Sequence, residues 1–118
     1  MGTAEALSAF SAAFGAGDIE AIMALMTDDV VFESTGPAPD GERVEGAAAV
    51  RAVWVELFGQ TRDAAFTEEE AFVADGRGVL RWRFTWTEAD GTPGHVRGVD
   101  VLTFRDGLVA EKLSYVKG

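Results

Sequence analysis

The sequence predicts an α+β fold in which helices come first and a run of antiparallel strands follows. In the first half of the 118 residues, apolar side chains recur at spacings of three and four, which is the period of a helix. Beyond Gly59 the spacing changes to two, the period of a strand. Asp-Gly pairs at Asp75, Asp90 and Asp106 divide this second half, and such pairs are typical of tight hairpin turns.

The first two helices are expected to meet at a glycine-rich corner. Residues 3–14 place their large apolar side chains on one helical face, and the glycines that follow end the helix. Asp18 then suits the N-cap of a second, short helix, because its carboxylate can accept a backbone N–H of the first turn. Asp28 and Asp29 are expected to close that helix.

A strand, a loop and a third helix complete the first half. Residues 30–34 are β-branched and aromatic, which favours a strand. Residues 35–46 contain prolines and glycines and predict a loop. Residues 47–58 carry a broad apolar stripe and predict a helix. The strands expected between the Asp-Gly turns are residues 64–74, 78–88, 94–105 and 108–117.

Length and composition limit the classes of protein. The chain is expected to form one domain, residues 1–118, because two would leave too little core for either. Ten basic against twenty acidic side chains give a net charge of -10, which repels nucleic acids and anionic membranes as partners. With no cysteine and one histidine, the sequence indicates no disulfide and no metal site. It contains no phosphate loop or dinucleotide fingerprint, so no cofactor is expected. No basic and apolar leader begins the chain, so a cytoplasmic location is expected.

Alternation along the second strand of the meander places Leu80, Trp82, Phe84 and Trp86 on one face, which must meet the helices. The same rule puts Asp100 of the next strand on a face whose other members are apolar or glycine. A carboxylate buried there either has partners or holds its proton, because an unpaired buried charge is costly. Asp100 is therefore a candidate acid–base group.

The alternative is a purely structural role, in which an interior partner such as Tyr115 hydrogen-bonds to Asp100 and the pair stabilises the sheet. The last strand offers two sets of side chains to the Asp100 face, and the turn at Asp106 decides between them. The sequence leaves both open. A plain two-residue turn gives Val109, Glu111, Leu113 and Tyr115, whereas a bulge gives Ala110, Lys112, Ser114 and Val116.

Three segments carry a family resemblance. Phe-Gly-Ala-Gly-Asp-Ile-Glu at 14–20, Leu-Met-Thr-Asp-Asp-Val-Val-Phe at 25–32 and Phe-Arg-Asp-Gly-Leu-Val at 104–109 resemble the nuclear transport factor 2-like superfamily, in its SnoaL-like and ketosteroid-isomerase-like branch. The resemblance implies a cone, in which a strongly curved antiparallel sheet wraps around three helices and an open end leads to an apolar cavity. It also implies a homodimer through the outer face of the sheet, with which the outward Val99 and Val101 agree.

The catalytic positions of the family are only partly present. Ketosteroid isomerases have a tyrosine on the first helix, a catalytic aspartate at the end of the first strand and a protonated aspartate in the meander. The matching positions here are Phe10, Ser34 and Asp100. Ser34 without a partner base cannot take a proton from carbon, so that mechanism is not expected. Cyclases of the SnoaL type use one aspartate as both acid and base, and Asp100 matches that need.

The sequence therefore predicts a small-molecule enzyme that performs cofactor-free acid–base chemistry, such as isomerisation, cyclisation or dehydration, on an apolar carbonyl compound. Asp100 and Tyr115 are the catalytic candidates. The alternatives are a protein that binds a hydrophobic ligand without turnover, and a structural dimer with a filled cone. Neither the substrate nor the pathway can be read from the residues. The side chains expected to line the cavity are Phe14, Phe32, Ser34, Trp54, Phe58, Trp82, Phe84, Trp86 and Leu102.

Overall fold

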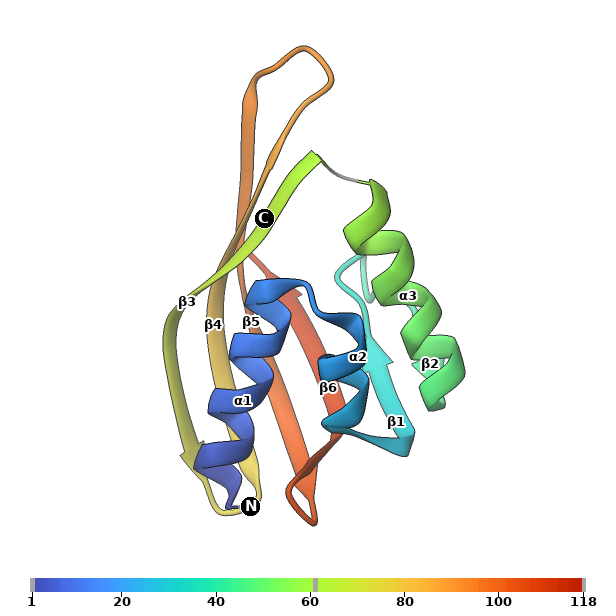
Figure 1. Ribbon diagram of the computed structural model, residues 1–118, viewed down its shortest axis with the longest axis vertical. Helices are drawn as coiled ribbons and strands as arrows, with labels where there is room; N and C mark the ends of the chain where they lie inside the picture. The colour runs from blue at the N-terminus through green and yellow to red at the C-terminus, as the bar shows by residue number, and fades with distance from the viewer. Residues whose placement is uncertain (1, 61, 118) are drawn as a thin grey trace.

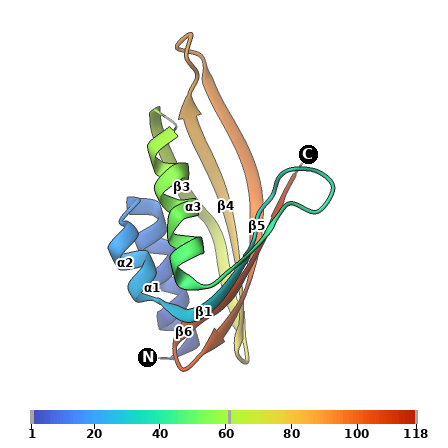
Figure 2. The same ribbon diagram turned by 90° about the vertical axis from the view of Figure 1, so that its right-hand side faces the viewer.

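The structure, a computed structural model, describes residues 2–60 and 62–117, with the backbone alone at 60 and 62. Over this part of the chain, three helices cover one face of a curved six-stranded sheet, which confirms the predicted α+β cone (Figures 1 and 2). The elements are α1 (Thr3–Ala16), α2 (Ile19–Ala24), β1 (Met26–Glu33), β2 (Arg43–Glu45), α3 (Ala47–Gln60), β3 (Arg62–Ala74), β4 (Arg77–Thr87), β5 (Pro93–Arg105) and β6 (Leu108–Val116).

The sheet contains the predicted meander and two further strands. Its order is β2-β1-β6-β5-β4-β3, and β3 to β6 pair antiparallel in sequence order. Asp75 and Asp106 have φ of 55° and 53° at the turns that join these strands, as their Asp-Gly pairs predict. One pairing was not expected. β1 lies parallel to β6, so the sheet is mixed and not wholly antiparallel.

The corner between α2 and β1 differs from the prediction. α2 begins at the expected N-cap, where Asp18 Oδ1 accepts the Ala21 N–H at 3.1 Å, but it ends at Ala24. Met26 already belongs to β1, because it pairs with Val109 of β6. Asp28 and Asp29 lie within that strand and do not close the helix.

Besides its pairing with β6, β1 contacts Arg105 and a short edge strand. The guanidinium of Arg105 donates a hydrogen bond to Asp29, which lowers the pKa of that carboxyl. The predicted loop 35–46 contains β2, which pairs antiparallel with β1. The first residues of β1 and the whole of β2 therefore depend on pairing across the sheet that local sequence does not encode.

A register shift between Thr103 and Phe104 settles the two alternatives for the last strand. Phe104 pairs with Val109, as in a plain hairpin, but Thr103 pairs with Glu111, so one residue of β6 is bulged. Beyond the bulge Asp100 lies opposite Ser114, and these two side chains share the inner face. Tyr115 consequently lies on the outer face with 53% of its surface exposed.

The core fills the deep end of the cone. Phe10, Ile22, Val30 and Leu102 are each completely buried there between the helices and the sheet. At the other end the β4–β5 hairpin extends beyond the helices (Figure 2) and contributes to a long axis of 44 Å. Among the described residues, none of the helices has the length and apolar character needed to cross a membrane.

Candidate functional site

A cavity of about 330 Å³ lies between the helices and the inner face of the sheet. Its wall is largely aromatic and aliphatic, which is typical of a site for a small apolar ligand. Most of the predicted lining residues are present, and sequence reasoning missed the rest. The wall consists of Phe14, Phe32, Ser34, Thr35, Val53, Trp54, Leu57, Phe66, Trp82, Phe84, Trp86, Val96, Lys112, Ser114 and Val116.

Three predicted residues lie elsewhere. Leu102 belongs to the fully buried core and does not reach the cavity. Phe58 packs against Phe14, with ring centroids 5.4 Å apart, and supports the wall from behind. Tyr115 is on the outer face because of the bulge, so it neither holds Asp100 nor faces the cavity.

The aromatic side of the cavity is built on β4. Trp82, Phe84 and Trp86 alternate along its inner face, and the rings of Phe84 and Trp86 are tilted by only 33°. Both tryptophans lie opposite glycines of β5, Trp82 opposite Gly98 and Trp86 opposite Gly94. A Cβ atom at Gly94 would approach Trp86 Cε2 to 2.5 Å, so the absent side chain lets the indole lie across the sheet. The cavity adjoins this indole, since Trp86 is one of its lining residues.

We expect Gly94→Ala to weaken ligand binding and to lower the free energy of unfolding by about 1–3 kcal/mol, the usual cost of overpacking. The added methyl group would force the Trp86 ring off the strand, where it would change the shape of the cavity. Urea unfolding and fluorescence titration with an apolar ring compound such as fluorene would measure both effects.

Gly59→Ala is the matched control. Gly59 lies in α3, and a Cβ atom there would meet no atom within 4 Å. Since alanine favours a helix over glycine, this variant should not be destabilised. Equal fluorescence titrations for Gly94→Ala and the unsubstituted protein would contradict the role assigned to Gly94.

A buried polar trio forms the inner wall of the cavity. Ser114 Oγ donates to Asp100 Oδ1 at 2.6 Å, and Lys112 Nζ donates to Ser114 Oγ at 2.8 Å. Lys112 Nζ also forms an ion pair with Asp100 Oδ2 at 3.1 Å, with side-chain exposures of 5% and 4%. The trio therefore satisfies the carboxylate, as a buried charge requires.

Aromatic rings surround the lysine of this trio. Lys112 Nζ lies 4.8 Å from the ring centroid of Phe32, 5.1 Å from that of Phe14 and 5.3 Å from that of Trp54. Such ring faces attract a cation, and more strongly when water is excluded. The ammonium is thus held by a carboxylate, a hydroxyl and three π faces.

Asp100 itself stands one layer behind the cavity. Lys112 and Ser114 line the cavity, whereas Asp100 lines only a hollow of about 20 Å³ beside it. The sequence correctly placed Asp100 on the inner face, where it is 3% exposed. Lys112 and Ser114 separate Asp100 from the cavity. Both belong to the set of β6 side chains that reach the inner face only because of the bulge.

Ser34 directly follows β1 and lies on the Ser114 side of the cavity, because the preceding Glu33 pairs with Leu113 of β6. Its hydroxyl donates to the Gly36 carbonyl at 2.8 Å and accepts the Glu42 N–H at 2.9 Å. Gly41, with φ of 70°, passes so close that a Cβ atom would lie 1.8 Å from the Ser34 carbonyl oxygen. These contacts hold the loop after β1, so the hydroxyl of Ser34 is committed to the backbone.

Within residues 2–60 and 62–117, no group of three or more His, Cys, Asp or Glu side chains is arranged to hold a metal ion. The polar side chains at the cavity wall include the amine of Lys112 and the hydroxyl of Ser114, with the carboxylate of Asp100 behind them. These groups can donate hydrogen bonds to an oxygen and can exchange protons.

Comparisons with known proteins agree with this architecture. The family model described as "SnoaL-like domain" matches residues 7–112. A nuclear transport factor 2-like protein of unknown function from Mesorhizobium loti is 39% identical, with a TM-score of 0.84 over 98% of this chain and 91% of that chain. A search of curated proteins found no match.

Two further solved structures hold small molecules. RV0760c from Mycobacterium tuberculosis, in complex with estradiol-17beta-hemisuccinate, is 26% identical, with a TM-score of 0.76 over 96% of this chain and 92% of that chain. TerC, co-crystallised with polyporic acid, is 22% identical, with a TM-score of 0.80 over 98% of this chain and 91% of that chain. At that identity TerC shows a shared fold.

Proposed function

This chain belongs to the SnoaL-like family of the nuclear transport factor 2-like superfamily, and from that premise we propose that it is a small-molecule enzyme. The proposed reaction is cofactor-free proton transfer on an apolar carbonyl compound, leading to isomerisation, cyclisation or dehydration. The observation that carries the proposal is the trio of Lys112, Ser114 and Asp100 at the inner wall of a largely apolar cavity.

The trio offers a donor for the carbonyl oxygen. An ammonium has three N–H groups, and Lys112 directs one to Asp100 and one to Ser114. The third can hydrogen-bond to a ligand oxygen and draw electrons from the neighbouring carbon, which makes the α C–H more acidic. Trp54 and Trp82 also line the cavity, and their buried indole N–H groups have no hydrogen-bond partner among the described residues.

The trio also offers a proton path. Ser114 lines the cavity, and its Oγ, which accepts one hydrogen bond from Lys112, can also accept the α proton while its own proton passes to Asp100 across the 2.6 Å hydrogen bond. Return of the proton to a different carbon completes an isomerisation with no net change in composition. In this scheme Ser114 meets the substrate, and Asp100 is a positioning and proton-storing residue behind it.

Exchange of α protons for deuterium tests the proposal before the natural substrate is identified. In D₂O, an apolar aryl ketone such as 1-indanone should lose its α-proton NMR signals faster with the protein than with buffer alone. Exchange at the buffer rate for a ketone that demonstrably binds would reject the enzymatic proposal.

Ligand binding without turnover is the second candidate. The observation that favours it is the position of Asp100, whose carboxylate is covered by Lys112 and Ser114 and does not line the cavity. Native mass spectrometry of the purified protein would reveal a retained ligand. A bound compound that leaves chemically unchanged, together with no α-proton exchange, would support storage over catalysis.

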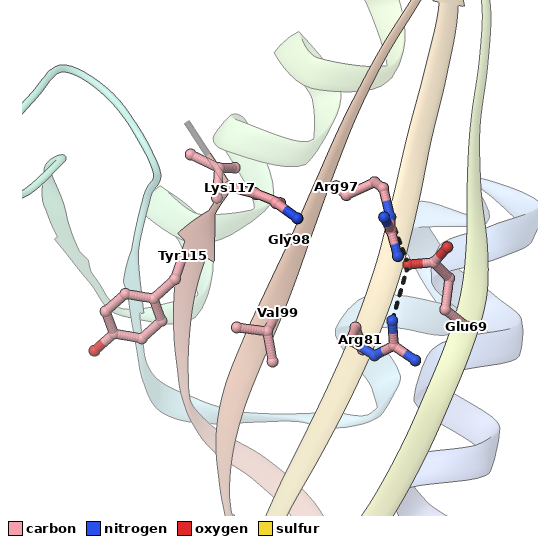
Figure 3. A pocket seen from close by; sticks show the side chains of 8 residues that line it. Glu69, Arg81, Arg97, Gly98, Val99, Tyr115 and Lys117 are labelled. Carbon is pink, nitrogen blue, oxygen red and sulfur yellow. Dashed lines mark hydrogen bonds and ion pairs between the residues drawn. The ribbon is translucent and has the colours of Figure 1, made fainter.

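We further propose that the protein forms a homodimer through the outer face of the sheet. Val99 lies opposite Tyr115, and Val101 opposite Leu113, so apolar side chains continue across β5 and β6 on that face. Beside them is a hollow of about 340 Å³ at Gly98 (Figure 3).

The rim of this hollow is charged. Arg97 and Arg81 both reach the carboxylate of Glu69, at 3.1 Å and 3.6 Å, as Figure 3 shows. Exposed apolar surface with a charged rim is typical of a protein interface. A second copy of this chain is the occupant that its family resemblance implies.

Val101→Asp tests the proposed dimer. We expect light scattering at micromolar concentration to give twice the 12.5 kDa mass of one chain for the unsubstituted protein, and a single-chain mass for the variant. Val55→Asp on α3 is the control, because Val55 is 51% exposed on the helical side. A single-chain mass for the unsubstituted protein would reject the dimer.

A further inference from the structure

Lys112 is a buried amine at the wall of a ligand-sized cavity. The chain has two lysines, Lys112 and Lys117, and only Lys117 is exposed. The Lys112 side chain is 5% exposed and lines the cavity. Lysine is rarely buried because its charge loses hydration, so a lysine in this position calls for an explanation.

Its surroundings can take a proton from the ammonium. Asp100 Oδ2 lies 3.1 Å from Nζ, and Ser114 Oγ lies at 2.8 Å. The rings of Phe14, Phe32 and Trp54 lie around Nζ, with centroids between 4.8 and 5.3 Å away, and Lys112 still lines the cavity. Because Asp100 Oδ2 is in direct contact with Nζ, transfer of one proton within the pair yields a nucleophilic amine without a solvent base.

We propose, on the basis of the function proposed above, that Lys112 Nζ forms a covalent iminium with the carbonyl carbon of the ligand. The substrate class is then a ketone or aldehyde on an apolar body, and not an ester or an amide. In the function proposed above, Lys112 only donates a hydrogen bond to the carbonyl oxygen. Here Lys112 is also the nucleophile, and the iminium that it forms activates the substrate.

The step balances in atoms and charge. The ammonium passes one proton to the Asp100 carboxylate, and the free amine adds to the carbonyl carbon to give a carbinolamine. Asp100 returns its proton to the departing hydroxyl, which leaves as water, and a C=N⁺ bond replaces C=O. The net reaction is ammonium plus carbonyl to iminium plus water, with no oxidant or reductant.

The wall around Lys112 suits the product of this step. Asp100 is the counter-ion of the ammonium before the reaction and of the iminium after it, so no new buried charge is created. The rings of Phe14, Phe32 and Trp54 face a cation in both states. Because an iminium withdraws electrons more strongly than a hydrogen-bonded carbonyl, it makes the α proton easier for Ser114 to remove.

Benzoylacetone, an apolar 1,3-diketone, is a suitable probe because its imine rearranges to a stable, absorbing enaminone. We expect one adduct per chain, with the mass of the diketone less one water. Labelling at Lys112 should be at least about tenfold faster than at Lys117, because the cavity holds the reacting groups together.

Tryptic peptides identify the modified lysine in the unsubstituted protein. An adduct at Lys112 blocks cleavage there and joins residues 106–112 to 113–117, whereas an adduct at Lys117 leaves that cleavage intact. Lys117→Arg should keep the labelling, and Lys112→Arg should lose it. The peptide result is decisive even if Lys112→Arg does not fold.

Quenching of tryptophan fluorescence provides the second readout, because Trp54, Trp82 and Trp86 all line the cavity. Quenching without an adduct at Lys112, or equal labelling of both lysines, would overturn the covalent role and leave the proposed function standing. The absence of both quenching and labelling, repeated with 1-indanone and fluorene, would overturn both proposals.

Discussion

Lys112→Met is expected to lower the free energy of unfolding by about 3–5 kcal/mol, the cost of breaking a buried ion pair by removing one partner. Asp100 is 3% exposed, so without the ammonium its carboxylate would be a buried charge that keeps, among the described residues, the Ser114 hydroxyl as its side-chain partner. Urea unfolding followed by tryptophan fluorescence would give the difference.

A double variant separates charge from shape. Lys112→Met combined with Asp100→Asn removes both charges and should be more stable than Lys112→Met alone, because no unpaired charge remains buried. Lys117→Met is the control at an exposed lysine and should change stability by less than about 0.5 kcal/mol. If the double variant were less stable than the single one, the ion pair would not be what stabilises this wall.

Ser114→Ala is expected to slow α-proton exchange of 1-indanone by about 10²- to 10⁴-fold, the usual contribution of a positioned acid or base. The substitution removes the group that connects Asp100 to the cavity, while the apolar wall remains. Affinity for fluorene, which has no oxygen, should therefore change little. NMR exchange rates and fluorescence titration measure the two effects separately.

Ser8→Ala is the matched control, since Ser8 is an exposed serine of α1 that does not line the cavity. It should exchange 1-indanone protons at the unsubstituted rate. Retention of full exchange by Ser114→Ala would exclude the proton path through the hydroxyl and would leave Lys112 as the sole group of the trio able to meet the substrate.

The two inner-wall substitutions differ in what they test. Lys112 contributes to both stability and the proposed chemistry, because its charge is buried beside Asp100. Ser114 contributes one hydroxyl, whose loss leaves two hydrogen bonds unmade and costs about 1–3 kcal/mol. If the exchange rate of Ser114→Ala is measured in conditions where the variant is folded, a slower rate therefore reports on the site and not on unfolding.

Sequence periodicity determined most of the architecture. The alternation of Trp82, Phe84 and Trp86 requires one face of a strand, and the Asp-Gly pairs require turns, because both rest on local backbone geometry. The same alternation placed Asp100 on the inner face. The predictions that were wrong concern segments whose conformation depends on partners distant in the sequence. Met26 joins a strand through Val109, and β2 exists only because β1 lies beside it.

Tertiary structure alone decided which side chains of β6 the cavity presents to a ligand. A single bulged residue near the Asp106 turn reverses the face of every later side chain of β6, because strand side chains alternate with a period of two. It turned Tyr115 outward and brought Lys112 and Ser114 against Asp100. Local sequence allowed either register, and the packing of the whole sheet against the helices selected one of them.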